Sequence, residues 1–404
     1  MSKIIKVKAR QVFDSRGNPT IEAEVFTKNN SALAICPSGA STGTYEAFEK
    51  RDKNNKRYLG KSVLNAVNLI NTKISKKLKG QNVHDQERID TLLINLDGTR
   101  QKTRLGANSI LAVSMAVKKL SARVKKLPLF KTFLVKNNFK LPYPLMNIIN
   151  GGAHANNGLR IQEFMIRPDR AKNFSDAMRI CYVVIKNLSK IIKNRGLSTS
   201  VGDEGGFAPM ISSNNQALDL IVSAIKKSGF VNGRDVSICL DVAANELKKP
   251  ILIEEFTELI KKYPIRSIED PFKEDDWDSW KKLTKNTKIQ IVGDDLFVTN
   301  TKRLAKGIKD NVANSILVKL NQIGTLSETL ETIEMAHRAG YTCVISHRSG
   351  APEDTILADI AVAVHSGQIK TGSLSRSDRL AKYNQLVRIE ELLGQTAEYA
   401  GRSI

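Results

Sequence analysis

A repeating alternation of short apolar runs and helical patterns governs which folds this chain can adopt. From residue 236 onward, each run is rich in β-branched or other apolar residues and ends at one polar residue. These polar residues are Asp241, Glu269, Asp294, Lys319, His347 and Lys370, at intervals of 28, 25, 25, 28 and 23 residues. Each interval has room for one strand, one helix and two short loops. The pattern predicts repeated βα units in a parallel sheet, and the segment 141–404 is long enough to close as an α/β barrel.

The segments between the runs have the periodicity of amphipathic helices. Their apolar stripes include Phe256, Leu259, Ile260 and Tyr263 in one segment, and Leu357, Ile360, Ala361 and Val364 in another. Thr325 and Glu328 have the spacing of a capping box, which predicts a helix start. Gly340 is a suitable residue to end that helix.

The N-terminal part of the chain follows a different pattern. Apolar and polar residues alternate from Thr20 to Thr27, which predicts a half-buried strand flanked by strands near 3–12 and 31–36. Helical spacing follows, first across Val63, Leu64, Val67, Ile70 and Ile74 and then across Leu105–Leu120. We therefore expect an α+β domain at residues 1–138 and a barrel domain at residues 139–404.

Composition and charge exclude several classes of protein. The 404 residues are 41% hydrophobic and 26% charged, as expected of a globular chain. Residues 1–10 have no apolar core of a secretory signal, and the apolar stretch Leu105–Leu120 is shorter than the roughly 20 residues that span a bilayer. The four cysteines are far apart in sequence, which favours reduced thiols and a cytoplasmic location.

The carboxyl ends of parallel strands in a barrel meet at one mouth, where such folds keep their active sites. Asp241, Glu269 and Asp294 are three carboxylates in this register, and oxygen ligands of this kind suit Mg²⁺. The alternative is that each carboxylate caps the helix after its strand. Lys319 lies between two apolar residues, where burial and neighbouring cations would lower its pKa and make it a base; a surface lysine is the alternative.

Other polar groups have the chemistry of an anion site. Arg348 and Ser349 follow His347 directly, and a guanidinium with a hydroxyl suits phosphate oxygens, with Lys370 as a further cation. Two glycine-containing stretches carry further candidates, Glu204 in one, and His154 and Glu163 in the other. A simple turn is the alternative for each stretch.

Taken together, these motifs resemble the enolase family nearly from end to end. The first set is Asp14-Ser-Arg-Gly-Asn-Pro-Thr20, Ser38-Gly-Ala-Ser-Thr-Gly43, Gly202-Asp-Glu-Gly-Gly206, Ser267-Ile-Glu-Asp-Pro-Phe272, Ser346-His-Arg-Ser-Gly350 and Ile369-Lys-Thr-Gly372. Asn321-Gln-Ile-Gly324 and Arg379-Leu-Ala-Lys-Tyr-Asn-Gln385 match in the same order. The resemblance implies an N-terminal α+β cap domain followed by a modified eight-stranded α/β barrel of the TIM type. It also implies a homodimer, with an octamer as the alternative.

The resemblance further implies a hydro-lyase that reversibly dehydrates 2-phospho-D-glycerate to phosphoenolpyruvate, a reaction of glycolysis and gluconeogenesis. Its first Mg²⁺ would be held by Asp241, Glu269 and Asp294. Ser41 would reach a second Mg²⁺ that binds with the substrate, and we expect residues 38–43 to form a loop that closes over it.

Catalytic and substrate-binding roles follow from the same match. Lys319 would be the base and Glu204 the acid, with Glu163 assisting Glu204. The residues expected to contact substrate are His154, Glu163, Glu269, Asp294, Lys319, His347, Arg348, Ser349 and Lys370.

Two departures from the family pattern concern loops. The stretch between Asp241 and Glu269 is short, as though a peripheral hairpin were missing. Ala351-Pro352 stands where the family commonly has Glu-Thr. This departure leaves open the geometry of the loop near the substrate phosphate.

Two other functions compete with this interpretation. Another member of the superfamily, such as an acid-sugar dehydratase, would share the metal chemistry, but Arg348 and Ser349 argue against it. A nucleic-acid-binding or surface-binding protein on an enolase scaffold would use the net charge of +22, which comes from 63 basic and 41 acidic residues. Lysine pairs on solvated helix faces account for much of this charge without such a partner.

We expect any binding of DNA or RNA to be weak, nonspecific and lost steeply as salt rises, because it would depend on neutralising phosphates alone. Fluorescence anisotropy with a labelled duplex at rising salt measures this dependence. Sequence-selective binding that persists at high salt would contradict the expectation.

Overall fold

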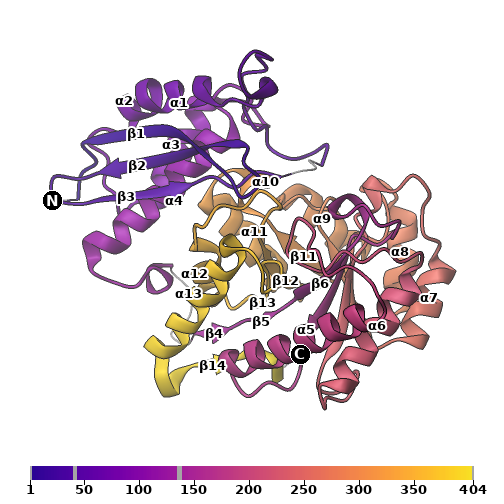
Figure 1. The fold of residues 1–404 in the computed structure, drawn as a ribbon. Coiled ribbons are helices and arrows are strands. Elements are labelled where there is room, and N and C mark those ends of the chain that lie inside the picture. The colour runs from indigo at the N-terminus through magenta and orange to yellow at the C-terminus, as the bar shows by residue number, and fades with distance from the viewer. Residues whose placement is uncertain (1, 40–42, 134–138, 403–404) are drawn as a thin grey trace.

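The computed structural model describes residues 2–39, 43–133 and 139–402. An N-terminal three-stranded sheet with its helices lies beside a larger barrel (Figure 1). The sheet is antiparallel, in the order β1 (Lys6–Phe13), β2 (Pro19–Phe26) and β3 (Ser31–Ile35). The predicted alternation is confirmed in β2, where Ile21, Ala23 and Val25 are buried.

Helices cover one face of this sheet. α4 (Ala107–Lys125) packs against β2 and β3 and is buried along most of its first three turns. α1 (Leu64–Leu69) continues through a π-helical turn, Ile70–Ile74, into α2 (Ser75–Leu78). α3 (Gln86–Asp97) completes this layer, and the predicted α+β character is confirmed.

The barrel is built from a nine-stranded sheet. Its sheet has the order β5-β13-β12-β11-β10-β9-β8-β7-β6. The two terminal strands, β5 (Tyr143–Pro144) and β6 (Met146–Asn150), belong to one stretch of chain interrupted only by Leu145. The Leu145 N–H donates to the Ile369 carbonyl at 2.8 Å, so this stretch pairs on both sides and closes the sheet.

Six strands carry the predicted βα repeat. They are β8 (Ser237–Asp241), β9 (Ile265–Glu269), β10 (Gln290–Gly293), β11 (Ser315–Val318), β12 (Thr342–Ser346) and β13 (Gly367–Lys370). Each ends at, or one residue before, the polar residue that the sequence pattern identified. β7 (Glu163–Arg167) is different, because it runs antiparallel to both β6 and β8.

Helices surround the barrel on the outside (Figure 1). They are α5 (Phe174–Asn194), α6 (Asn214–Lys227), α7 (Ile253–Lys262), α8 (Trp277–Asn286), α9 (Thr301–Asp310), α11 (Leu326–Arg338), α12 (Ile356–Ala363) and α13 (Ser377–Leu393). The short α10 (Leu320–Ile323) instead follows Lys319 at the barrel mouth and packs against α4. A short parallel pair, β4 (Lys140–Leu141) and β14 (Glu398–Tyr399), lies apart from the barrel sheet. The predicted start of α11 is confirmed, because the Thr325 side chain accepts a hydrogen bond from the Glu328 N–H.

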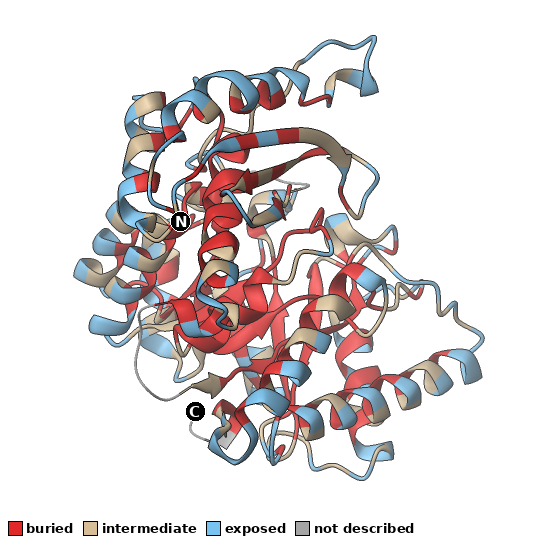
Figure 2. Ribbon diagram, turned by 90° about the vertical axis from the view of Figure 1, so that its left-hand side faces the viewer, coloured by how far each residue is buried: buried red, intermediate tan, exposed pale blue. Residues whose placement is uncertain are grey.

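Side chains fill the barrel rather than leaving a pore. One apolar cluster combines strand residues with Leu145, between β5 and β6, and Ala400, in a C-terminal 3-10 turn. Its strand residues are Tyr143, Met165, Cys239, Val292, Leu317 and Val344. Figure 2 shows the buried strands at the centre and exposed residues on the outer helix faces. The four cysteines are buried and free. No helix within the described residues is long and apolar enough to cross a membrane.

Candidate active site

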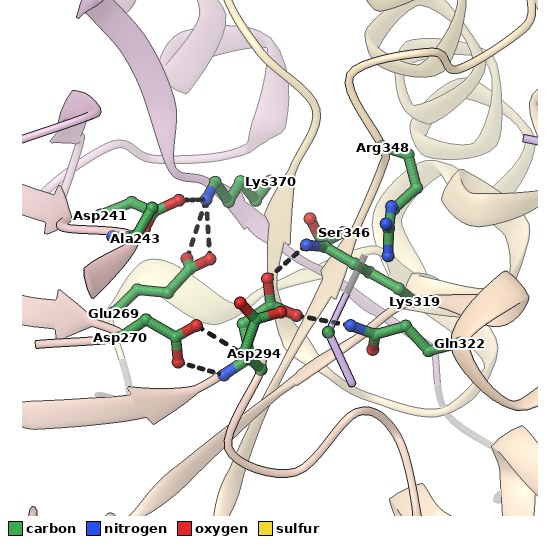
Figure 3. A network of polar contacts seen from close by, with 12 residues as sticks. Asp241, Ala243, Glu269, Asp270, Asp294, Lys319, Gln322, Ser346, Arg348 and Lys370 are labelled. Atoms are coloured by element: carbon green, nitrogen blue, oxygen red, sulfur yellow. Dashed lines mark hydrogen bonds and ion pairs between the residues drawn. The ribbon is translucent and has the colours of Figure 1, made fainter. Parts of the chain in front are cut away.

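Polar side chains from the strand ends meet at one mouth of the barrel (Figure 3). Because β8 to β13 are parallel, their carboxyl ends lie on the same rim, and Asp241 is in register with Glu269 on the neighbouring strand. Asp241, Glu269 and Asp294 are 4%, 2% and 7% exposed. Three carboxylates are therefore buried together, an arrangement that needs compensating cations or ligands.

Lys370 provides one of these cations. Its Nζ lies 2.7 Å from Asp241 Oδ2 and 2.9 Å from Glu269 Oε2 (Figure 3), and 3.3 Å from Glu163 Oε1. Burial lowers the pKa of Lys370, but the three carboxylates oppose this effect. Together they bring the pKa of Lys370 well above its usual range. The ammonium stays charged and joins two of the predicted metal ligands.

Lys319 pairs with the third predicted metal ligand. Its ammonium contacts Asp294 directly, and its backbone N–H donates to Thr299 Oγ1 at 2.9 Å. We expected a lowered pKa for Lys319, and that expectation is wrong for this structure. Burial is the largest single effect and lowers the pKa, but the carboxylates of Asp294 and Glu269 oppose it, and the net pKa is above its ordinary value.

The backbone next to Asp294 is fixed by Asp270, which follows Glu269. Asp270 accepts hydrogen bonds from the N–H groups of Asp294 and Asp295 at 2.8 and 2.9 Å. Asp270 has φ of +42°, an unfavourable value for a residue with a side chain. Gln322 completes this support by donating from Nε2 to Asp294 Oδ1 at 2.8 Å.

Glu163 reaches the mouth because β7 runs antiparallel to its neighbours. Its first residue, rather than its last, therefore lies at the rim, and Glu163 is in register with Asp241. Glu163 Oε2 is buried and has no hydrogen-bond partner among the residues that the structure describes. His154 Nδ1 is 3.7 Å from Glu163 Oε1.

Glu204 comes from the loop between α5 and α6. The following residue, Gly205, has φ of +84°, and a Cβ there would lie 2.8 Å from the Ser375 carbonyl oxygen. Glycine thus permits the tight turn that brings Glu204 into the mouth. Glu204 Oε2 lies 3.1 Å from His347 Nε2.

The hydrogen bonds of His347 determine its tautomer. Arg379 Nη1 lies 2.5 Å from His347 Nδ1, and a guanidinium only donates, so Nδ1 must accept. The imidazole proton is then on Nε2, directed at Glu204. Burial lowers the pKa of His347 to about 3, against the opposing effect of Glu204.

Glu163 and Glu204 differ in their affinity for a proton. Burial raises the pKa of Glu163, and the charge of Glu204 raises it further. Burial is the largest single effect and raises the pKa of Glu204, but His347, His154 and Arg379 all lower it, and the net pKa is well below its usual range. The two opposite shifts favour protonation of Glu163 over protonation of Glu204.

The segment after His347 carries Arg348 and Ser349, the predicted anion-binding groups. Arg348 Nη1 donates to Glu46 Oε1 at 2.9 Å, and the Ser349 carbonyl accepts from Arg379 Nη2 at 2.6 Å. Ala351 N–H donates to the Arg348 carbonyl at 3.0 Å, and Lys382 contacts the Pro352 carbonyl, so Ala351-Pro352 forms an anchored turn.

A cavity of about 40 Å³ opens among these groups. The predicted site residues that line it are His154, Glu163, Glu204, Asp241, Asp294, Lys319, His347, Arg348, Ser349 and Lys370. Glu269 lies beneath Lys370, and Ser41 is outside the described residues, as are its neighbours 40 and 42 in the predicted closing loop. A larger cavity of about 340 Å³ lies beside α6 and α7, and none of these residues lines it.

Comparisons with known proteins agree with this geometry. Residues 4–133 match the model of the enolase N-terminal domain, and residues 138–250 and 245–404 match that of the enolase C-terminal TIM barrel domain. A protein named enolase from Pelagibacter ubique (strain HTCC1062) is 72% identical over 412 aligned positions, which cover 98% of this chain and 99% of that relative.

The chain belongs to the enolase family. Membership confirms the predicted fold class, an N-terminal α+β domain with a TIM-type barrel, and the predicted hydro-lyase activity. The shortened stretch of this enolase-family chain passes through a 3-10 turn, Ala244–Glu246, into α7. Asn245 Nδ2 in that turn donates to Asp295 Oδ2 at 2.9 Å, so the short connection still contacts the site.

Two groups of described residues bring three ligand atoms within 4.8 Å of one another, namely His154, Glu163 and Glu204, and Asp270, Asp294 and Asp295. The predicted metal ligands, Asp241, Glu269 and Asp294, are not one of these two groups. Lys370 Nζ contacts both Asp241 and Glu269 and so joins these two carboxylates. The chemistry of the predicted ligands nevertheless fits Mg²⁺, since all three side chains offer hard oxygen donors from adjacent strands at a buried mouth.

Sequence reasoning missed several residues that shape this enolase-family site. Asp270, Gln322 and Arg379 lie inside motifs that carried the family resemblance, but periodicity gives no signal for their contacts. Glu46 follows Gly43 by three residues, and only the folded chain shows that it reaches Arg348.

We predict that His347 stays neutral in the folded enzyme and titrates near pH 3 instead of its ordinary value of about 6.5. The unfolded chain then takes up a proton at higher pH than the folded chain. The stability due to neutral His347 is complete above pH 6.5 and falls as the pH drops toward 3, by about 2 kcal/mol at pH 5.

Urea unfolding at pH 7 and pH 5 tests this prediction. His347→Gln should lose about 2 kcal/mol less than wild type between the two pH values, whereas His337→Gln, at an exposed position on α11, should behave as wild type. The same pH dependence in His347→Gln as in wild type would contradict the prediction.

Proposed function

We propose that this enolase-family protein acts on 2-phospho-D-glycerate with Lys319 as the base and Glu204 as the acid. Both groups line the same buried cavity as the anion-binding Arg348 and Ser349, and this observation carries the proposal. A lysine or histidine base used with one or two Mg²⁺ ions is the known pattern of the enolase superfamily, so the assignment also rests on family membership. The reaction is a step of glycolysis.

We assign the first Mg²⁺ to Asp241, Glu269 and Asp294 and the second, which binds with substrate, to Ser41. Bound Mg²⁺ would stabilise the negative charge that develops on the substrate carboxylate as its neighbouring proton is removed. Without such stabilisation the proton next to the carboxylate is only weakly acidic, because its removal adds negative charge to an anion.

Lys319 removes the proton from C2 of the substrate in its neutral amine form. Asp294 favours the ammonium form while its full charge faces Lys319. When Asp294 shares its charge with another cation, that effect weakens and the amine releases its proton more readily. Pairing with Asp294 thus keeps Lys319 charged in the resting enzyme and links its activation to ligand binding.

Glu204 transfers a proton to the hydroxyl that leaves C3. The C3–O bond breaks, the departing oxygen takes this proton, and water forms while the C2–C3 double bond is completed. Glu163 holds the proton of the pair in the resting arrangement and supplies it to Glu204. His347 Nε2 lies 3.1 Å from Glu204 Oε2, and His154 lines the same cavity.

We further propose a homodimer, with an octamer as the alternative assembly, in the cytoplasm. We place the boundary between the two domains at residues 138 and 139, next to a stretch outside the described residues.

The purified protein should convert 2-phosphoglycerate to enolpyruvate product, measured by ultraviolet absorbance, and should stop when excess EDTA removes Mg²⁺. Lys319→Ala should lower kcat by at least about 10²-fold, the lower end of what a positioned general base contributes. Lys309→Ala, which removes an exposed lysine from the last turn of α9, is the matched control and should retain full turnover. Full activity in EDTA, or normal turnover in a folded Lys319→Ala variant, would contradict the proposed mechanism.

A further inference from the structure

Glu46 belongs to the N-terminal part of the chain, yet its carboxylate lies at the barrel mouth. Glu46 is 8% exposed, and its Oε1 accepts from Arg348 Nη1 at 2.9 Å. The same oxygen accepts from the Gly43 N–H at 3.1 Å and from Gln322 Nε2 at 3.4 Å. One carboxylate oxygen therefore receives three donors from three separate segments.

The guanidinium of Arg348 is confined on a second side by Gly39. A Cβ at position 39 would lie 1.9 Å from Arg348 Nη2, so a larger residue there would displace the guanidinium from its present position. A guanidinium is planar, and its N–H groups point in fixed directions within that plane. Holding the plane at Glu46 and against Gly39 therefore determines where the other N–H groups of Arg348 point.

We propose that Glu46 is a positioning residue that orients Arg348 toward the substrate phosphate. The inference rests on the proposed function, in which Arg348 binds that phosphate. Glu46 does not touch substrate in this account, and its effect passes through Arg348.

The contact with Gln322 extends this role to the metal-binding side of the site. Gln322 Nε2 also donates to Asp294 Oδ1 at 2.8 Å, and Gln322 Oε1 accepts from Thr299 Oγ1 at 2.8 Å. The backbone fixes the same alignment, because the Ala47 N–H donates to the Gln322 carbonyl at 2.8 Å. Glu46 thus links the arginine that binds the anion to the carboxylate that pairs with Lys319.

Two substitutions separate the position of the oxygen from the charge that it carries. Glu46→Asp retains the charge but shortens the side chain by one methylene, so its oxygen no longer reaches Arg348. Glu46→Gln retains the reach and an oxygen acceptor but removes the charge. A positioning role predicts that Glu46→Gln preserves function better than Glu46→Asp.

The experiment measures kcat and KM for 2-phosphoglycerate, and the dissociation constant of inorganic phosphate by calorimetry, all with saturating Mg²⁺. Glu46→Asp should raise both KM and the phosphate dissociation constant by at least about 10-fold, with kcat within about 3-fold of wild type, because the lost interaction orients binding. Glu46→Gln should stay within about 3-fold of wild type in all three values. Glu334→Gln is the matched control, since Glu334 pairs with Arg338 at 3.7 Å on the exposed side of α11 and neither lines the cavity, and it should match wild type.

Wild-type values in Glu46→Asp, a loss confined to kcat, or a greater loss in Glu46→Gln than in Glu46→Asp would overturn the positioning role. Arg348→Gln separates this outcome from failure of the proposed function. If Arg348→Gln leaves the phosphate dissociation constant unchanged, Arg348 does not bind phosphate and the proposed function itself must be revised. If Arg348→Gln weakens phosphate binding and Glu46→Asp does not, only the role of Glu46 is wrong.

Discussion

Burial of several carboxylates in one barrel mouth is the constraint on which the rest of this structure depends. Removing carboxylates from water costs several kcal/mol for each ion unless nearby cations and hydrogen bonds compensate. Lys370 and Lys319 supply cations at the carboxylates themselves, and both are held inside the mouth. The carboxyl ends of the parallel strands lie on one rim, so they place these carboxylates and lysines side by side. Each lysine then compensates the charge of a neighbouring carboxylate.

The same constraint explains why the N-terminal domain is part of the site. Arg348 is a buried guanidinium whose N–H groups need hydrogen-bond acceptors, and Glu46 from the other domain provides one. A second attachment lies close by, where Ser38 and Gly350 exchange backbone hydrogen bonds at 3.1 and 3.0 Å. A Cβ at Gly350 would lie 2.6 Å from Ser38 Oγ, so this close approach requires glycine. Contacts between the domains therefore set the geometry of the loop that carries Arg348 and Ser349.

Much of this arrangement could be predicted from the sequence, because strand periodicity is a local property. The spacing of polar residues after apolar runs located the six parallel strands from β8 to β13, and it correctly placed Asp241, Glu269 and Lys370 at one mouth of the barrel. Glu163 could not be found in this way, since its strand runs antiparallel and presents its first residue to the rim. Glycine-containing stretches made Glu163 and Glu204 candidates, and only the resemblance to a family gave them their expected roles.

The pKa of Lys319 shows a second limit of sequence reasoning. Its apolar neighbours correctly indicated burial, which alone would lower the pKa. The opposing carboxylate of Asp294 comes from another strand 25 residues earlier, and its distance from the amine is a property of the fold. Glu46 and Gln322 were missed for the same reason, because their contacts join segments that are remote in sequence.

Anomalous diffraction from crystals soaked in Mn²⁺ tests the central claim most directly, since Mn²⁺ accepts the same oxygen ligands as Mg²⁺ and can be located by its scattering. The account predicts a peak coordinated by carboxylate oxygens of Asp241, Glu269 and Asp294. A peak held instead by His154, Glu163 and Glu204, or by Asp270, Asp294 and Asp295, would contradict it, because the strand ends would then not form the metal site.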